Sequence, residues 1–189
     1  MPGILEAALR SVSPFTDAEL AHVTCRFRNL HVAKGQPLLA PGEVCGHLYF
    51  VNGGCLRTYF VTKDGSEKTR LLLPSYSFGT ALASFVQQKP SLECIDALED
   101  SDLWALSHPD FTTLSDSPAW MRCYLTMLER AYAFQNNKLE QLVTLSSAER
   151  YERLVAENPV LLERVSGRIL ASYLDMTPET LSRIRARRS

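Results

Sequence analysis

The chain has 189 residues, of which 46% are hydrophobic and 22% are charged. This composition is that of an ordinary folded protein and excludes a disordered, collagen-like or membrane-embedded chain. The net charge of −1 hides an asymmetry, because residues 164–189 contain six arginines against Asp175 and Glu179, which leaves +4 there and −5 elsewhere. A basic C-terminal end favours a polyanionic partner at that end.

The first ten residues lack a basic segment followed by an apolar core, and no stretch reaches the roughly 20 apolar residues that span a bilayer. We therefore expect a cytoplasmic location and no membrane partner. The cysteines form no CxxC pair, and the histidines show neither HxH nor HxxxH spacing. We expect reduced thiols, no metal site and no cofactor.

The N-terminal part predicts one short helix followed by an all-β region. Thr16 and Glu19 have capping-box spacing, which predicts a helix start. From about residue 28 to residue 109, glycines separate short apolar runs, and the clearest strands are predicted at 47–51, 56–61, 68–73, 93–97 and 103–107. Asp64-Gly65 predicts a hairpin turn in which both residues tolerate positive φ. The regular spacing predicts a barrel or a sandwich.

A long helix is predicted after Pro109. Its apolar positions follow a heptad spacing that predicts a dimerisation seam, formed by Met121, Leu125, Leu128, Tyr132, Gln135, Leu139 and Leu142. The alternative is that this stripe packs only on its own β domain. A helix of about 25 residues would extend roughly 37 Å, which is longer than a small barrel needs for cover.

The next boundary is predicted at residues 144–147. Ser146 and Glu149 form a second capping box, which predicts a helix through Glu157 that Asn158-Pro159 ends. The chain is therefore divided into a β domain at 1–116, a long helix at 117–145 and a C-terminal helical domain at 146–189.

The C-terminal residues predict two short helices joined by a tight turn. Residues 167–174 form the first helix, Asp175-Met176 the turn, and Thr177 caps the second helix, with Pro178 at its first position. Two apolar residues of this second helix, Leu181 and Ile184, are expected to point inward. The residues left for its outer surface are Glu179, Thr180, Ser182, Arg183 and Arg187.

A glutamate among arginines is informative on a helix that meets nucleic acid. In the major groove glutamate can accept a hydrogen bond from cytosine, and arginine can bind guanine. Glu179 and Arg183 lie four residues apart and share one face of the predicted helix. The alternative is an ordinary surface pair, which contributes only a few tenths of a kcal/mol.

The segment Thr177-Pro178-Glu179-Thr180-Leu181-Ser182-Arg183-Ile184 resembles the reading-helix pattern of the Crp-Fnr family, S/T-x-E-T-hydrophobic-x-R-hydrophobic. The resemblance extends through the barrel glycines, the Asp64-Gly65 turn and the long helix. It implies an α+β fold, with an N-terminal cyclic-nucleotide-binding-like β-barrel (jelly roll), a long dimerisation helix and a C-terminal helix-turn-helix bundle. The implied function is homodimeric transcription regulation, with double-stranded DNA as partner and RNA polymerase as a further candidate partner.

The resemblance also implies roles for single residues. Glu179 and Arg183 are the expected base readers, and Thr177 and Thr180 the expected phosphate contacts. Ser182 is a further surface residue expected to contact DNA. Arg185, Arg187 and Arg188 are expected to neutralise phosphates of the DNA backbone.

The sequence departs from the family pattern at two points. Asp175 replaces the turn glycine, which aspartate tolerates at some cost. The sequence stops at Ser189, before the usual β-hairpin wing, and so resembles the wingless subgroup. Fewer phosphate contacts should make DNA binding weaker and less sensitive to salt.

In cyclic-nucleotide binders of this family a glutamate holds the ribose and an arginine holds the phosphate. Here Thr80 occupies the glutamate position and Ser91 the arginine position, while Glu93 would repel an anion. Cyclic AMP is therefore not expected to bind. Either a neutral polar effector binds, or Leu82, Phe85 and Leu92 fill the pocket. The residues predicted to form the effector pocket are Gly79, Thr80, Ala81, Ser91, Leu92, Gln135 and Asn136.

Two other functions remain open for the sequence. One is a dimeric ligand-binding adaptor whose DNA-binding end is degenerate, suggested by the absent wing. The other is a cupin-like enzyme, which the missing HxH spacing disfavours. We expect a regulator and not an enzyme.

Overall fold

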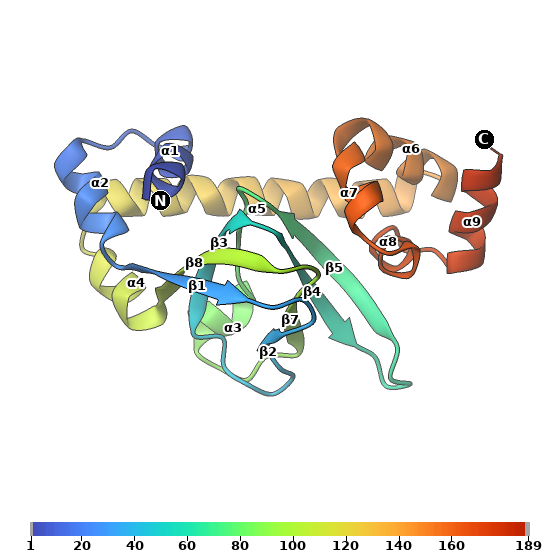
Figure 1. Ribbon diagram of the computed structural model, residues 1–189, viewed down its shortest axis with the longest axis horizontal. Coiled ribbons are helices and arrows are strands. Elements are labelled where there is room, and N and C mark those ends of the chain that lie inside the picture. Colours follow the sequence, from blue (N-terminus) through green and yellow to red (C-terminus); the bar gives the residue numbers. More distant parts are fainter. Residues whose placement is uncertain (1, 188–189) are drawn as a thin grey trace.

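The computed structural model describes residues 2–187, in which a β domain and a C-terminal helical bundle lie along one long helix (Figure 1). Two helices precede the first strand, and the four helices that follow the long helix form the C-terminal bundle. The helices are α1 (Pro2–Val12), α2 (Asp17–Thr24), α3 (Leu82–Gln87), α4 (His108–Leu114), α5 (Pro118–Thr144), α6 (Ser147–Glu157), α7 (Pro159–Arg164), α8 (Gly167–Tyr173) and α9 (Pro178–Ala186). No helix among the described residues is both long enough and apolar enough to cross a membrane.

The β domain is built from two four-stranded antiparallel sheets, with strand orders β1-β8-β3-β6 and β2-β7-β4-β5. The strands are β1 (Phe27–Val32), β2 (Pro37–Leu39), β3 (His47–Gly53), β4 (Cys55–Val61), β5 (Glu67–Pro74), β6 (Phe78–Gly79), β7 (Glu93–Ala97) and β8 (Ser101–Ser107). The predicted mixed fold class and all five predicted strands are confirmed. The described strands are divided between two sheets and are not hydrogen-bonded into one closed barrel.

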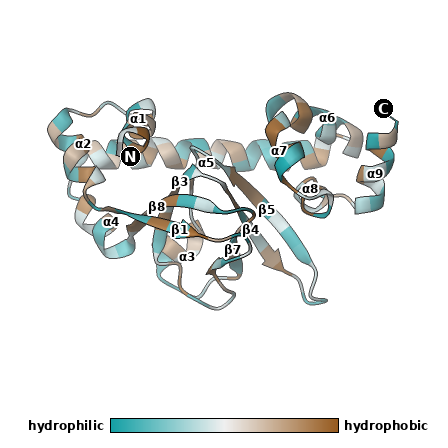
Figure 2. Ribbon diagram, viewed as in Figure 1, coloured by the Kyte–Doolittle hydropathy of each residue, from teal (hydrophilic) through white to brown (hydrophobic). Residues whose placement is uncertain are grey.

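The core of this domain lies where the inner faces of the two sheets meet the first turns of α5. Phe50, Leu56 and Leu103 are fully buried between the sheets. Trp120, at the start of α5, is also fully buried and meets the rings of Phe27 and Phe111 edge-on, at centroid distances of 6.3 and 6.0 Å. Strand β5 changes from hydrophilic at its hairpin end to hydrophobic where it enters this core (Figure 2).

The predicted hairpin turn joins β4 to β5. Its backbone is closed by hydrogen bonds from Thr62 N to Ser66 O (2.9 Å) and from Gly65 N to Thr62 O (2.9 Å). The predicted hairpin turn is confirmed, and of its two residues only Gly65 adopts a positive φ, +80°. Instead, the Asp64 carboxylate accepts hydrogen bonds from Thr62 and Ser66 and fixes the loop from inside.

The long helix α5 has 27 residues and extends about 40 Å. Ser117 caps it by accepting a hydrogen bond from the Trp120 amide, and Pro118 occupies its first position. Its buried residues are confined to the first two turns, at Ala119, Trp120 and Cys123. The rest of the helix lies on the β domain only along part of its surface and leaves apolar side chains exposed.

The C-terminal bundle begins as the sequence predicts and contains one helix that the sequence analysis missed. Both predicted capping boxes are present, at Thr16 with Glu19 and at Ser146 with Glu149. Pro159 ends α6 as expected but also starts α7, because proline is favoured at the first position of a helix. The core of the bundle includes Cys55 and Leu72 from the sheets, so the bundle packs directly on β4 and β5.

Candidate nucleic-acid interface and effector cavity

The two C-terminal helices form a helix-turn-helix whose turn is fixed by its own backbone. Asp175 adopts the left-handed conformation with φ +52°. The next amide, Met176 N, donates to Ala171 O at 3.0 Å and thereby closes the end of α8. Aspartate at this position is therefore compatible with the turn, as expected, although it is more strained there than glycine would be.

Helix α9 is oriented by one cap and one buried leucine. The Thr177 hydroxyl accepts a hydrogen bond from Thr180 N at 3.3 Å, and Pro178 follows at the first helical position. Leu181 is buried in the bundle with 2% exposure, and Ile184 is half-buried beside it. This places the opposite face of α9 outward, at the C-terminal tip of the molecule (Figure 1).

The outward face of α9 carries most of the residues predicted to contact DNA. Thr177, Glu179, Ser182, Arg183 and Arg187 are exposed. Thr180 is half-buried, because it lies against the cap. Arg188 lies outside the described residues.

Glu179 and Arg183 do not form the surface pair that was the alternative explanation for their spacing. The ion pairs found within residues 2–187 do not include one between these two side chains. Hydrogen bonds from its own backbone amide and from Thr177 lower the pKa of Glu179, so its carboxylate remains ionised at neutral pH. The helix thus presents one anionic and one cationic group separately to solvent.

Arg185 is placed differently from the other predicted phosphate contacts. It is half-buried, and its guanidinium lies 5.8 Å from the centroid of the Tyr151 ring on α6. This cation–π contact packs the end of α9 against α6. The structure therefore gives Arg185 a packing role that the sequence analysis missed.

Arg150 is a second structural residue that the sequence did not indicate. From α6, its guanidinium donates to Leu145 O (2.7 Å), Leu174 O (3.0 Å) and Asp175 O (3.3 Å). One side chain therefore joins the end of the long helix to the turn of the helix-turn-helix. No local pattern marks such a residue, because all three acceptors are backbone carbonyls.

Helix α8 docks on the hairpin strand β5, beside it in Figure 1. The Ser172 hydroxyl accepts from Thr69 N at 2.8 Å and donates to Glu67 O at 3.0 Å. Lys138 of α5 donates to Arg70 O at 2.8 Å, and its ammonium lies 4.1 Å from the centroid of the Tyr173 ring. Burial lowers the pKa of Lys138 to about 8. These contacts join the β domain, the long helix and the helix-turn-helix at one junction.

A cavity of about 460 Å³ lies between the β domain and the middle of α5. Its wall is mostly apolar and aromatic, and three predicted pocket residues, Gly79, Thr80 and Gln135, line it. The other four lie elsewhere. Ala81 is buried and does not line the cavity. Ser91 is buried with its hydroxyl hydrogen-bonded to the Glu93 backbone, and Leu92 and Asn136 are exposed.

The expectation that Leu92 helps to fill the pocket is wrong, because its side chain is 83% exposed. The other two expected fillers, Leu82 and Phe85, line the cavity and leave it open. Leu92 follows the buried Ser91, whose hydrogen bonds to Glu93 form a tight local turn that directs the next side chain outward. No local sequence pattern indicates this turn.

Arg70 is the one cavity residue of clear chemical importance that the sequence analysis did not single out. It lines the cavity from β5, and its guanidinium pairs with both carboxylate oxygens of Glu93 on β7, at 2.9 and 3.0 Å. The Glu93 side chain is only 8% exposed. Glu93 is therefore half of a buried ion pair and not a free charge beside the pocket.

The predicted dimerisation seam is mostly exposed in this single chain. The exposed seam residues are Met121, Leu125, Tyr132, Leu139 and Leu142. Leu128 and Gln135 are half-buried because they also line the cavity. The seam is thus an apolar face without a partner in the described chain, and its middle borders the cavity.

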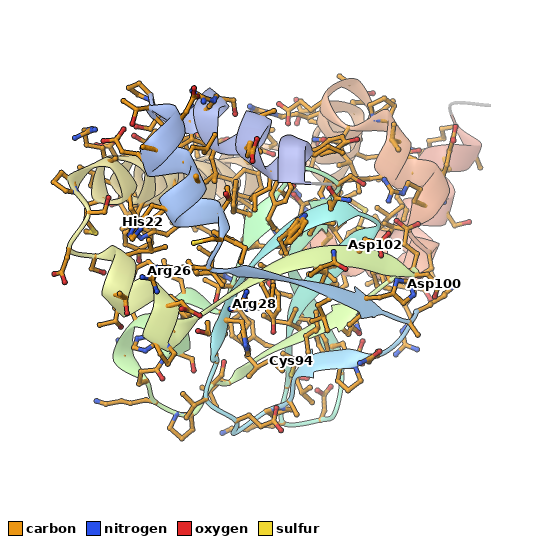
Figure 3. The ribbon with its side chains drawn as sticks, turned by 60° about the vertical axis from the view of Figure 1, so that its left-hand side comes forward. His22, Arg26, Arg28, Cys94, Asp100 and Asp102 are labelled. Atoms are coloured by element: carbon orange, nitrogen blue, oxygen red, sulfur yellow. The ribbon has the colours of Figure 1, made fainter. Side chains whose placement is uncertain are left out.

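Side chains able to bind a metal do not converge in the described part of the chain. Within residues 2–187, no group of three or more histidine, cysteine or acidic residues is close enough together to hold an ion. His22 on α2, Cys94 on β7 and Asp102 on β8 come from separate elements, as labelled in Figure 3. Asp102 pairs instead with His31 across the sheet at 2.9 Å.

Comparisons with known proteins agree with this architecture. Residues 29–117 match the family model described as "Cyclic nucleotide-binding domain". No curated protein sequence matches the chain. Among solved structures, the c-di-GMP responsive global regulator CLP of Xanthomonas campestris superposes with a TM-score of 0.72, at 18% identity over 91% of each chain.

Two further structures give the same result. FixK2 of Bradyrhizobium japonicum has a TM-score of 0.70 at 15% identity, covering 85% of this chain and 83% of its own. A transcriptional regulator from Eubacterium rectale, described as of the Crp/Fnr family, has a TM-score of 0.69 at 21% identity, covering 90% of this chain and 82% of its own. In all three, the similarity covers at least 85% of this chain.

Proposed function

We propose that this chain is a homodimeric, sequence-specific DNA-binding regulator of transcription. It has the fold of the Crp/Fnr regulators, and residues 29–117 match the family model of the cyclic nucleotide-binding domain. The observation that carries the proposal is the outer face of α9. Glu179, Ser182 and Arg183 are exposed there, while Leu181 fixes the opposite face in the bundle.

The chemistry of this face fits direct reading of bases. An ionised carboxylate can accept a hydrogen bond from the amino group of cytosine, and a guanidinium can donate two hydrogen bonds to guanine. Thr177 and Thr180, at the start of the helix, are the proposed phosphate contacts, because the helix N-terminus attracts an anion. Arg187, one turn beyond Arg183, supplies a further positive charge for the backbone.

Dimerisation is proposed through the exposed seam of α5. Two such helices packed side by side would bury the apolar positions of the seam that a single chain leaves in water. A twofold axis along this seam would present two copies of α9 to the same face of a duplex. Reading helices about 34 Å apart would then enter successive major grooves.

We also propose that cyclic AMP is not the effector. The hydroxyl of Thr80, at the position that binds ribose in the family, donates to His47 O at 2.8 Å. The hydroxyl of Ser91, at the position of the phosphate-binding arginine, is bonded to the Glu93 backbone. Both groups are small, uncharged and already engaged.

The test is fluorescence anisotropy with labelled duplexes, one from the region upstream of the protein's own coding sequence and one of scrambled sequence. We expect the wild type to prefer the native duplex, and Arg183→Ala to lose roughly 10- to 100-fold of that preference. The control is Arg153→Ala, since Arg153 is an exposed arginine of α6 paired with Glu157 at 2.7 Å. Equal loss in both variants, or no preference in the wild type, would contradict base reading by α9.

A further inference from the structure

We propose that the cavity between the β domain and α5 binds an uncharged aromatic small molecule. The inference rests on the proposed function, because it names the class of effector that such a regulator would take. Three observations support it: the apolar and aromatic composition of the cavity wall, the neutral charge balance of that wall, and the position of the cavity on the proposed dimerisation seam.

The cavity wall offers rings and aliphatic side chains over nearly its whole surface. Phe78 and Phe85 come from the β domain, and Tyr124, Met127 and Tyr132 come from successive turns of α5. Rings in such a wall favour another ring by edge-to-face and offset contacts. A volume of about 460 Å³ is within the usual range for a small-molecule site.

The positive charge in the wall is already neutralised. Arg70 is bound to both oxygens of Glu93, whose side chain is almost completely buried. Both contacts come from Nη1 of Arg70, and the pair carries no net charge. An anionic ligand at Arg70 would therefore lie beside the Glu93 carboxylate, which repels it, and displacing Glu93 would leave a buried carboxylate without its partner. An uncharged ligand leaves this ion pair intact, so the wall favours a neutral molecule over a phosphate.

Several polar groups of the wall remain available to orient a ligand, namely the hydroxyls of Tyr124 and Tyr132 and the amide of Gln135. The side-chain amide of Gln135 makes no hydrogen bond within residues 2–187, in contrast to the engaged hydroxyl of Thr80. Its amide can both donate and accept. The ligand class is therefore an aromatic ring that carries one hydroxyl, carbonyl or similar neutral group.

The open side of the cavity is part of the dimerisation seam. Leu128, Tyr132 and Gln135 line the cavity and also occupy heptad positions of α5. In the proposed dimer the partner's long helix would cover this side, so a bound molecule would contact both subunits. Ligand binding and the packing of the two helices would then influence each other.

The experiment titrates the full-length protein, after extensive dialysis, with the uncharged fluorescent probe N-phenyl-1-naphthylamine. We expect saturable, blue-shifted emission for the wild type. Ala131→Trp, which fills the cavity from α5, should weaken binding at least tenfold. Ala133→Trp is the matched control, since Ala133 is exposed on the same helix and does not line the cavity, and it should bind like the wild type.

Competition separates the neutral class from the anionic one. A tenfold excess of cyclic AMP over the probe should leave the wild-type signal unchanged. Glu93→Gln releases Arg70 from its partner, so this variant should become at least tenfold more sensitive to cyclic AMP. Absence of probe binding, equal binding by Ala131→Trp, or displacement of the probe from the wild type by cyclic AMP would each overturn the proposal.

DNA binding measured on the same preparations separates this proposal from the proposed function. Probe binding that Ala131→Trp abolishes, in a protein that does not prefer its own upstream duplex, would support the cavity assignment and refute the regulator. Sequence-specific DNA binding without any probe binding would support the regulator and refute the cavity assignment.

Discussion

The helix-turn-helix and the cavity beside α5 are built in opposite ways. The helix-turn-helix is specified by consecutive residues, from the turn at Asp175 through the cap at Thr177 to the buried Leu181. The cavity is assembled from residues between Leu48 and Gln135, which come together only when two sheets and a helix have packed. Local determinants can be predicted residue by residue, whereas a cavity depends on partners that are distant in sequence.

The largest expected effect on stability is in the core of the β domain, which depends on contacts between residues distant in sequence. Phe50 is fully buried between the sheets and lies 4.8 Å from the ring of Phe78, which lines the cavity. Phe50→Ala should lower the free energy of unfolding by about 3–5 kcal/mol, because it leaves a large void in the core. Urea unfolding followed by circular dichroism measures this change.

The matched control for that variant is Phe60→Ala on β4, where the ring is 38% exposed. It should cost less, because 38% of the Phe60 surface stays in water in the folded state, whereas Phe50 is fully buried. Equal destabilisation by both substitutions would mean that the sheets do not pack as described.

The junction between the two regions should depend on pH. Burial lowers the pKa of Lys138 to about 8, below its ordinary value of 10.5. Between these values the folded state binds fewer protons than the unfolded state, so the stability contributed by Lys138 rises as pH increases from about 8 to 10.5. Full deprotonation would add up to about 3 kcal/mol.

Stability measured across this window checks the effect, and Lys138→Met is the comparison that removes the titrating group. The wild-type curve minus the variant curve should rise with pH between 8 and 10.5. A flat or falling difference would show that the Lys138 ammonium is not desolvated against Tyr173 and the Arg70 carbonyl.

A smaller effect is expected at the docking of α8 on β5. Ser172→Ala removes the hydroxyl that bonds both Thr69 N and Glu67 O. The loss should be about 1–2 kcal/mol, because a backbone amide of the sheet loses its partner. Chemical unfolding is again the measurement, with the exposed Ser182→Ala expected within about 0.5 kcal/mol of the wild type.

The smallest effect is expected from the cap of α9. Thr177→Ala should cost about 1 kcal/mol, because the Thr180 amide loses its acceptor. Thr177→Ser keeps the hydroxyl and should retain most of that stability. Hydrogen exchange at the first turn of α9 measures the difference locally, and faster exchange in both variants would contradict a capping role for the hydroxyl.

Much of the fold could be predicted from the sequence because its signals are local. The capping boxes and the Asp64-Gly65 turn each lie within a few consecutive residues, and the heptad spacing lies within one continuous helix. The structure contains all of these elements. The likeness to the Crp-Fnr family, first suggested by the eight residues around Glu179 and Arg183, is confirmed at the level of the fold.

The missed elements have identifiable physical reasons. Strand β1 does not alternate, because its buried positions are only Phe27 and Val32 at its two ends. Strand β6 has two residues, and α3 has no side-chain cap, so neither gives a readable signal. The N-terminal helix α1 was also not predicted, although Leu5 and Leu9 anchor it in the core.

The candidate functional residues also divide into those with a local sequence signal and those that depend on partners distant in sequence. The exposed face of α9 was predicted, because helical period alone decides which residues point outward. Arg70, Lys138 and Arg150 were missed, because each acts through a carbonyl or a carboxylate far away in sequence. Glu93 was expected to act on a ligand as an unpaired negative charge. The sequence did not indicate that it pairs with Arg70, because Arg70 lies 23 residues earlier.

The most direct test of the account is selection of binding sites from a random DNA pool by the wild type and by Glu179→Ala. The account predicts a twofold-symmetric wild-type site, with half-sites centred about 10 base pairs apart. It also predicts that Glu179→Ala relaxes one symmetric pair of positions and leaves the rest of the site intact. Enrichment of no sequence, or an identical site for both proteins, would contradict the claim that α9 reads bases.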